Sequence, residues 1–281
     1  SKRVLRLGIV LYGFRLTFQD VLAVGAPALL IDAVVVTVTI CGGVLLGRLL
    51  KMDRGIALLT SVGSGICGAA AELGAESTIR ARPYKTAVAV STVVIFGTIS
   101  MFLYPVLYRH GIVSLTPEQM GIYTGATLHE VAHVVGAGNA MNGEISDAAI
   151  FVKMIRVMML VPVLLTISYS ISVARARRRR LADRRSCGGV TRRIAVPWFA
   201  LGFLAVIGFN SFGLLGEATV SFIHSLDTFL LTMAMTALGA ETSIEKFKKA
   251  GAKPFVLSLL LFVWLVGGGW LLVKYMAPPL M

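Results

Sequence analysis

Charged residues are scarce in this chain of 281 residues. They make up 15% of it, against about 25% in a typical soluble domain, while hydrophobic residues make up 56% and the mean hydropathy is +0.81. A soluble enzyme, a coiled coil and a disordered chain are all inconsistent with so little charge. The composition therefore predicts a polytopic membrane protein.

Cysteine is scarce as well. The three cysteines, Cys41, Cys67 and Cys187, are too few and too scattered to form a disulfide framework. Acidic residues number only 14 against 27 Lys and Arg, which gives a net charge of +13. Nine of those basic residues are arginines within residues 175–193, so the excess is one basic loop. Such a loop beside apolar segments is typical of a cytoplasmic loop or a site for anionic lipid, and no nucleic-acid partner is expected.

The chain contains several long apolar runs. A membrane-spanning helix needs about 20 mostly apolar residues. The runs that meet this length are Ala28–Gly47, Thr86–Tyr108, Ala148–Ala174, Ile194–Gly216 and Pro254–Val273. Two shorter runs, Val4–Gly13 and Thr228–Gly239, each end at a glycine before a polar stretch. The whole chain, residues 1–281, is therefore expected to be a single all-α membrane domain.

The distribution of Lys and Arg predicts the orientation. With the basic loop 175–193 in the cytoplasm, the following spans place the short loop near Glu217 and His224 outside and the C-terminus in the periplasm. The chain opens with Ser1 rather than Met, so we expect residues of the natural protein to precede it. The predicted location is therefore a membrane, with loop 175–193 on its cytoplasmic side.

Two glycine-rich segments carry ionisable residues at membrane depth, namely Gly55–Ile79 and Gly121–Asn139. Such composition is typical of broken or re-entrant helices, whose free backbone groups must face protein or a watery cavity. If both segments re-enter, Arg80, Arg82 and Lys85 stay on the cytoplasmic side. Full crossing of both segments remains the alternative.

The chain also contains two weak internal repeats. Residues 13–28 resemble residues 239–254, and Gly65–Ala75 resembles Thr127–Ala137. In the predicted topology the members of each pair run in opposite directions. We therefore expect an inverted-repeat bundle with pseudo-symmetric halves of about 1–110 and 121–281.

The sequence His129-Glu130-Val131-Ala132-His133 matches the pattern H-E-x-x-H. On one helix this pattern places two imidazoles on the same face for zinc, with the glutamate as general base. An intramembrane zinc metalloprotease is therefore an alternative function. The competing interpretation is a polar half-helix along a substrate or proton path.

Several stretches resemble the YeiH family of bacterial inner-membrane proteins, whose members are often labelled sulfate exporters. The matching stretches include LRLGIVLYGFRLTF, ICGAAA, AVAVSTVVIFGT, GIYTGATLHEVAHVV, KMIRVMML and DTFLLTMAMTALG. They cover nearly the whole chain. The resemblance implies a location in the bacterial inner membrane and a secondary-transporter-like fold of ten to eleven helices, with about two helices before residue 1.

A small oxyanion is best held by helix N-termini, which offer free N–H groups and a positive dipole end. We expect one half-helix to open at Ser61–Gly65 and the other at Thr124–Thr127, with countercharge from Lys153 and Arg156. The predicted substrate-binding residues are Ser61, Gly63, Ser64, Gly65, Cys67, Gly68, Thr124, Gly125, Thr127, Lys153, Arg156 and Asn210. His129 and Glu130 are the predicted proton-coupling residues.

These expectations combine into a secondary transporter of a small anion such as sulfate, sulfite or a sulfonate, working by alternating access with proton coupling. We expect transport rather than catalysis, no cofactor and no bound metal. The expected partners are the anion, membrane lipid and a second copy in a homodimer. A non-transport scaffold that acts through the arginine-rich loop is a further alternative.

Overall fold

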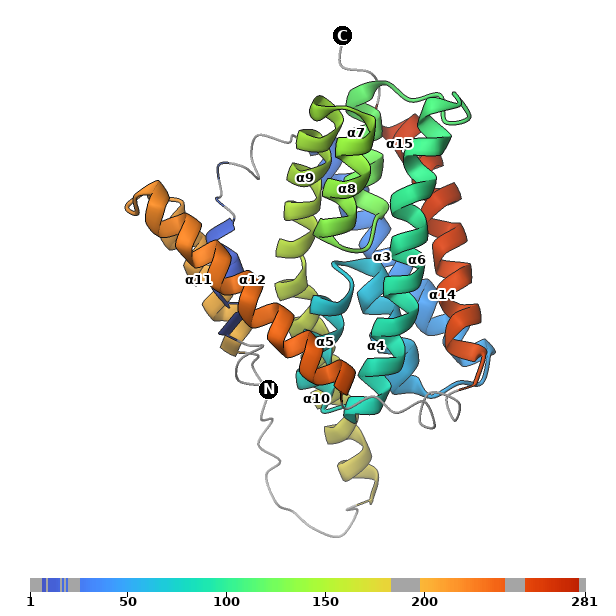
Figure 1. Ribbon diagram of the computed structural model, residues 1–281. Helices are drawn as coiled ribbons and strands as arrows, with labels where there is room; N and C mark the ends of the chain where they lie inside the picture. The colour runs from blue at the N-terminus through green and yellow to red at the C-terminus, as the bar shows by residue number, and fades with distance from the viewer. Residues whose placement is uncertain are drawn as a thin grey trace.

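The computed structural model describes residues 7–8, 10–15, 17, 19, 26–182, 198–240 and 251–277. Within these ranges every regular element is a helix, as Figure 1 shows. The elements are η1 (Tyr12–Arg15), α3 (Ala26–Leu49), α4 (Arg54–Gly65), α5 (Ala69–Ile79), α6 (Pro83–Arg109), α7 (Pro117–Thr127), α8 (Val131–Met141), α9 (Gly143–Met158), α10 (Leu160–Ala182), α11 (Trp198–Asn210), α12 (Glu217–Ala240), α14 (Lys253–Val263), the π-helical segment η2 (Trp264–Gly268) and α15 (Gly269–Met276). The predicted all-α class is confirmed.

Four helical segments are long and apolar enough to cross a membrane, and each coincides with a predicted span. They are Ala28–Leu49, Pro83–Arg109, Gly143–Val173 and Lys253–Met276. The fifth predicted span, Ile194–Gly216, is shorter in the structure, because α11 ends at Asn210 and Gly213 follows in a turn with a φ of 64°. The predicted short loop is present as residues 211–216, directly before Glu217, but it does not extend to His224, which lies within α12.

Both glycine-rich segments are broken helices, which confirms this part of the predicted fold. The first is divided into α4 and α5 by Ile66–Gly68, and the second into α7 and α8 by Leu128–Glu130. In each case the break removes backbone hydrogen bonds in the middle of an apolar bundle. The groups that replace those bonds define the site described below.

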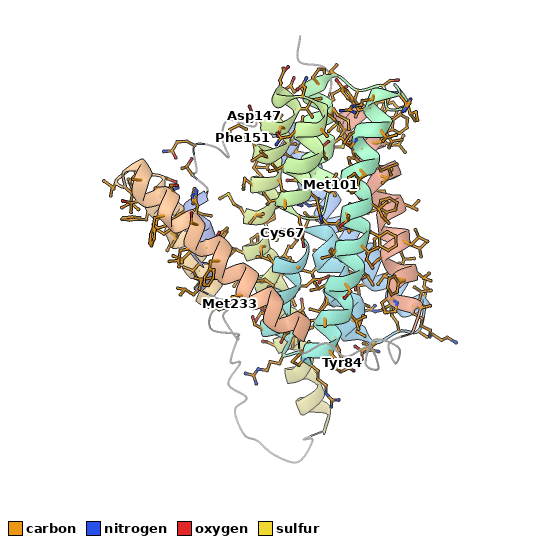
Figure 2. The ribbon with its side chains drawn as sticks, viewed as in Figure 1. Cys67, Tyr84, Met101, Asp147, Phe151 and Met233 are labelled. Atoms are coloured by element: carbon orange, nitrogen blue, oxygen red, sulfur yellow. The ribbon has the colours of Figure 1, made fainter. Side chains whose placement is uncertain are left out.

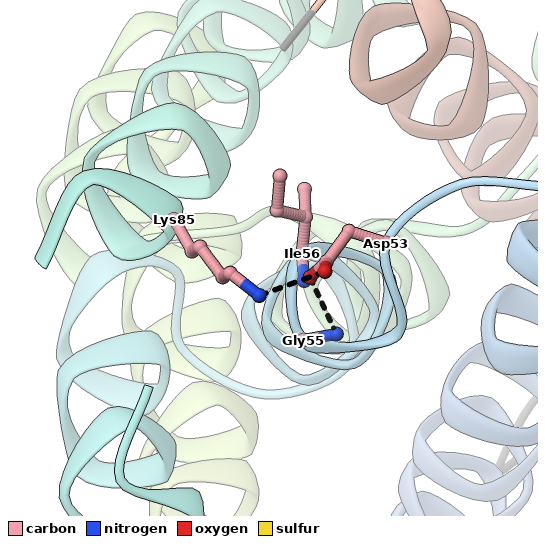
Figure 3. A network of polar contacts seen from close by, with 4 residues as sticks. All are labelled: Asp53, Gly55, Ile56 and Lys85. Atoms are coloured by element: carbon pink, nitrogen blue, oxygen red, sulfur yellow. Dashed lines mark hydrogen bonds and ion pairs between the residues drawn. The ribbon is translucent and has the colours of Figure 1, made fainter. Parts of the chain in front are cut away.

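The first broken helix enters and leaves at the same end of the bundle. Asp53 caps the start of α4, where its carboxylate accepts hydrogen bonds from the amides of Gly55 and Ile56. The same carboxylate binds the ammonium group of Lys85 at 2.7 Å, as Figure 3 shows. Lys85 lies in the first turn of α6, directly after the end of α5. The start of α4 and the end of α5 are therefore neighbours, which makes this pair a re-entrant hairpin.

The second broken helix is a hairpin at the opposite end. The guanidinium group of Arg109, the last residue of α6, donates to the carbonyl of Ala140 in the last turn of α8 at 2.5 Å. The start of α7 follows Arg109 by a short loop. Since α6 has 27 residues and so spans about 40 Å, the two hairpins enter from opposite ends. Figure 1 shows α7 and α8 in the upper half and α4 and α5 in the lower half.

The interior consists of two main apolar clusters. One contains Leu59, Val62 and Leu164, and so joins α4 to α10; the other contains Tyr104, Tyr123 and Ile145, and so joins α6, α7 and α9. Helices α11 and α12 lie to one side in Figure 1 and contact η1. The two re-entrant hairpins thus lie within the bundle, where their ends can meet.

Several predictions fall outside the described residues. They are the basic loop beyond Ala182, residues 241–250 and most of the chain before Ala26. The repeat between residues 13–28 and 239–254 therefore stays a prediction, as do the pseudo-symmetric halves and the sidedness of the loops.

Candidate functional site

The first break depends on a glycine. Gly68 adopts a φ of 67° and a ψ of −135°, a conformation in which a side chain would be strained. Its amide donates to the carbonyl of Gly63 at 2.9 Å, while the Ile66 amide closes the last turn of α4 on Val62. A Cβ on Gly68 would also lie 2.5 Å from the Cγ of Glu130. Gly68 therefore ends one half-helix, starts the next and makes room for the second break.

The second break is extended rather than turned. Leu128 follows α7 with φ −67° and ψ 152°, and Glu130 precedes α8 with φ −117° and ψ 153°. His129 lies between them and is buried. Leu128 and Glu130 leave the helical conformation, so the last carbonyls of α7 lose their partners on the next turn.

Lys153 and Arg156 of α9 bind the carbonyls at both breaks. The Lys153 ammonium donates to Ile66 O at 2.8 Å and to Leu128 O at 2.5 Å. The Arg156 guanidinium donates to Gly65 O at 2.8 Å, to Ser64 O at 3.1 Å and to Ala126 O. Both side chains are fully buried. Two cations thus neutralise the negative dipole ends of α4 and α7 and hold them together.

This contact is at mid-depth in the bundle. Cys67, in the first break, is labelled in Figure 2 between Tyr84 near the start of α6 and Asp147 near the start of α9. The helical segments that carry these outer labels, Pro83–Arg109 and Gly143–Val173, are both long and apolar enough to cross a membrane. The sequence therefore correctly predicted that the two glycine-rich segments meet near the middle from opposing ends.

The predicted direction of the half-helices is wrong. Ser61–Gly65 and Thr124–Thr127 close α4 and α7 instead of opening them, so these stretches present carbonyls and not amides. The amide-bearing ends are Gly68–Ala71 of α5 and Glu130–His133 of α8. A glycine-rich stretch indicates that a helix is broken, but not at which residue one half-helix ends and the next begins. That position depends on which glycine adopts a positive φ, and composition does not show this.

The hydroxyl groups of these stretches have different environments. Ser61 Oγ donates to Ala57 O at 2.6 Å, and Thr127 Oγ1 donates to Tyr123 O and pairs with the Tyr104 hydroxyl at 2.8 Å. The hydroxyls of Ser64 and Thr124 are buried with no hydrogen-bond partner among the described residues. Ser64 and Thr124 are thus the predicted residues whose polar groups remain available at the breaks.

Glycines allow the close packing around the breaks. A Cβ on Gly125 would lie 2.4 Å from the carbonyl oxygen of Ala149, so α7 and α9 contact each other backbone to backbone. A Cβ on Gly63 would lie 2.2 Å from Oε1 of Glu72. At Gly63 and Gly125 there is thus no room for a side chain, and the lack of one allows the neighbouring groups to pack closely.

Two acidic residues, Glu130 and Glu72, lie at the first break. Glu130 Oε1 accepts a hydrogen bond from the amide of Ala69, the first residue of α5, at 3.4 Å. Glu72 lies in the first turn of the same helix, and neither of its carboxyl oxygens has a hydrogen-bond partner among the described residues. Glu72 is not among the site residues predicted from the sequence. The available signal was an acidic residue in the first turn after the first break.

Asp32 of α3 was also missed as a site residue. Its side chain is fully buried, it has no hydrogen-bond partner among the described residues, and it interacts electrostatically with Arg156 and Lys153. A single carboxylate inside an otherwise apolar span was the signal that could have included it.

Asn210 is not brought together with the other predicted residues. Its side-chain amide donates to the carbonyl of Phe14 at 3.0 Å, which ties α11 to η1. Among the described residues, Asn210 therefore makes a contact between helices. It does not lie with the other predicted substrate-binding residues, so the structure does not support its place in that site.

The H-E-x-x-H pattern is not on one helix. His129 lies before the first residue of α8, whereas His133 lies in its first turn, so the break separates the two imidazoles of the pattern. Both histidines face Gly97 of α6, where a Cβ would lie 2.7 Å from His133 Nδ1 and 3.3 Å from His129 Cβ. Among the described residues no group of three His, Cys, Asp or Glu side chains is arranged to hold a metal ion. The helical spacing that suggested a zinc site is therefore not realised.

These features define a class: a polytopic helical membrane protein in which two broken, re-entrant helices meet at buried ionisable residues. Residues 1–258 match the family model described as Conserved hypothetical protein 698. The chain is 73% identical over 281 residues to a UPF0324 membrane protein of Bacteroides thetaiotaomicron, covering 100% of this chain and 82% of that protein. It is 46% identical over 267 residues to the UPF0324 inner membrane protein YeiH of Escherichia coli K12, covering 95% and 74% respectively. The chain belongs to the UPF0324 family, which confirms the resemblance drawn from its sequence.

A third relative, a UPF0324 membrane protein of Pseudomonas aeruginosa, is 47% identical over 280 residues, with 98% of this chain and 77% of the relative covered. No solved structure matches the chain.

Proposed function

We propose that this chain is a secondary transporter of the bacterial inner membrane that moves a small anion, such as sulfate, sulfite or a sulfonate, by alternating access. The observation that carries the proposal is the set of hydrogen bonds from Lys153 and Arg156 to the last carbonyls of both re-entrant hairpins. Irregular backbone at membrane depth is tolerated only where it is buried in protein or lines a cavity. Broken helices that meet at mid-depth are a common basis for substrate sites in transporters.

The chemistry at the breaks favours an anion. The N-termini of α5 and α8 both lie at the breaks, and a helix N-terminus carries a positive partial charge. The negative dipole ends of α4 and α7 are neutralised by the two buried cations. In this proposal the anion is held by amides and by the hydroxyls of Ser64 and Thr124, while Lys153 and Arg156 position the two hairpins.

Proton coupling through His129 and Glu130 is part of the proposal. His129 is buried, and its Nδ1 has no hydrogen-bond partner in the part of the chain that the structure describes, while Glu130 binds the N-terminus of α5. The proposed sidedness places residues 175–193 in the cytoplasm and the C-terminus in the periplasm. The proposed reaction is transport and includes no catalytic step.

A thermal-shift screen identifies the substrate. Purified protein is heated with sulfate, sulfite, taurine or succinate at constant ionic strength, with chloride as the reference. A ligand that binds only the folded state raises the melting temperature in proportion to RT ln(1 + [L]/Kd). If none of the oxyanions does so at concentrations far above physiological levels, the anion class is wrong.

Flux measurements then test coupling. The anion that stabilises the protein is followed into proteoliposomes with and without an imposed pH gradient. Glu130→Gln should abolish the dependence of flux on the gradient. Glu118→Gln is the matched control, because Glu118 is exposed at the far end of α7. Equal gradient dependence in both variants would remove Glu130 from the mechanism.

A further inference from the structure

The last segment that is long and apolar enough to cross a membrane, Lys253–Met276, is not one continuous α-helix. It consists of α14, the π-helical segment η2 and α15. At the end of η2 the amide of Gly269 donates to the carbonyl of Trp264, five residues earlier. Helices bend at π-helical turns, and such turns are frequent at functional sites. The structure thus contains a further interrupted helix besides the two re-entrant hairpins.

The two halves of this helix contact different hairpins. Leu257 and Leu261 of α14 form an apolar cluster with Ala57 of α4, in the first hairpin. Gly269 begins α15, and a Cβ there would lie 2.4 Å from Cγ2 of Thr127, the last residue of α7 in the second hairpin. Figure 1 shows α14 in the lower half of the bundle and α15 in the upper half. The segment η2 therefore joins a part that packs on one hairpin to a part that packs on the other.

Two hydrogen bonds hold η2 in its present position. Trp264 Nε1 donates to Thr39 Oγ1 at 3.1 Å, which attaches η2 to α3. The Tyr123 hydroxyl of α7 donates to the carbonyl of Val266 at 2.8 Å. The Tyr123 ring is stacked on that of Tyr104 with 4.6 Å between the ring centroids, so its position is well defined. Tyr123 thus fastens the second hairpin to η2.

The glycines of η2 differ in what packing requires of them. A Cβ on Gly268 would lie 2.2 Å from the ring of Trp264, so this glycine leaves room for the indole. A Cβ on Gly267 would have no atom of the described residues within 4 Å. Glycine weakens a helix relative to alanine, because its backbone is freer in the absence of a side chain. Gly267 therefore makes η2 easier to deform without being needed for packing.

We propose that η2 is a hinge at which the last helix bends when the two hairpins move relative to each other, and that Tyr123 is a positioning residue that holds this hinge in its present state. The inference rests on the proposed transport function, because alternating access requires one part of the bundle to move against another. With Trp264 attached to α3, α14 follows the first hairpin and α15 follows the second. An uninterrupted helix packed against both hairpins would resist this movement.

Alkylation of Cys67, which lies in the first break, measures the movement without measuring transport. The full chain with Cys41→Ser and Cys187→Ser is placed in lipid nanodiscs and treated with N-ethylmaleimide. Cys67 is buried, so its thiol reacts when the hairpins separate. Gly267→Ala should slow this reaction about four- to fivefold, the factor that corresponds to the difference in helix propensity between glycine and alanine. Gly42→Ala is the matched control, because its Cβ also enters open space, and it should leave the rate unchanged.

Tyr123→Phe should change the rate in the opposite direction. This variant keeps the stacked ring and loses the hydrogen bond to Val266 O, so alkylation should be about two- to tenfold faster. Its control is Tyr169→Phe, because Tyr169 is half exposed on α10 and its variant should have no effect. Gly267→Ala should not lower the melting temperature, so a slower reaction in this variant cannot come from a folding defect.

The hinge would be overturned by a rate for Gly267→Ala equal to or above that of Gly42→Ala. A rate for Tyr123→Phe equal to that of Tyr169→Phe, or no alkylation of Cys67 in any variant, would also overturn it. These outcomes are distinguishable from failure of the transport proposal. If the rates change as expected and no anion flux is measured in proteoliposomes, the hinge stands and the transport function falls.

Discussion

The hydrogen bonds of Arg156 lead to a large and specific effect on stability. Arg156→Met removes the donors to the carbonyls of Ser64, Gly65 and Ala126. Each orphaned buried carbonyl costs about 1–3 kcal/mol. The variant also no longer buries a charged guanidinium group, and this offsets part of the lost stability. We therefore expect the unfolding free energy to fall by about 3 kcal/mol in total. For a protein of this size that corresponds to a fall in melting temperature of about 6 °C.

The assay is thermal unfolding of the purified protein in detergent. Arg82→Met is the matched control, because Arg82 is exposed in the loop before α6 and should change the melting temperature by less than about 1 °C. Lys153→Met should also destabilise the protein, and the double variant should be less than additive, because both cations contact Leu128 O. A melting temperature for Arg156→Met equal to that of the control would refute the assignment of these bonds.

Two further predictions concern packing and pH. Gly125→Ala should lower the unfolding free energy by about 1–3 kcal/mol, because the added Cβ would meet a backbone oxygen. The control is Gly42→Ala, whose added Cβ would have no neighbouring atom within 4 Å and which should be neutral or slightly stabilising in the same unfolding assay. Burial raises the pKa of the Asp53 carboxyl, but hydrogen bonds from Lys85 and from backbone amides outweigh this effect and hold the pKa below its ordinary value. A carboxyl whose pKa is depressed in the folded state stabilises above its unfolded pKa and loses that contribution as the pH falls through its folded pKa. Asp53→Asn should therefore lower the unfolding free energy at neutral pH, by less than about 1 kcal/mol because the ion pair is partly exposed. In unfolding experiments across pH, the difference from the unmodified protein should shrink below about pH 4. A difference that stays constant with pH would contradict the ion pair.

The sequence predicted those parts of the fold that depend on local composition. Ala28–Leu49 and Pro83–Arg109 are recognisable because hydropathy over about 20 residues is itself the cause of membrane insertion. The breaks near Gly65 and Gly125 are recognisable because glycine-rich, polar stretches cannot continue as lipid-facing helices. Three basic residues between Gly55–Ile79 and the next span favoured re-entry over full crossing.

The contacts within the site could not be predicted in the same way. Lys153 and Arg156 were expected to face a substrate, but the structure directs both to backbone carbonyls that become free only because α4 and α7 end where they do. That direction depends on Gly68 taking a left-handed conformation against Glu130, which is a tertiary contact. The burial of Glu72 against Gly63 is likewise a tertiary contact that the sequence does not show.

The central claim is that the two broken helices enter the membrane from opposite sides. It can be tested with a membrane-impermeant thiol reagent on intact cells and on inverted vesicles, after Cys41, Cys67 and Cys187 have been replaced by serine. Single cysteines are introduced by Arg54→Cys, Arg80→Cys, Glu118→Cys and Asn142→Cys. Positions 54 and 80 should be labelled from one side of the membrane, and positions 118 and 142 from the other. Labelling of positions 54 and 80 from different sides would contradict it.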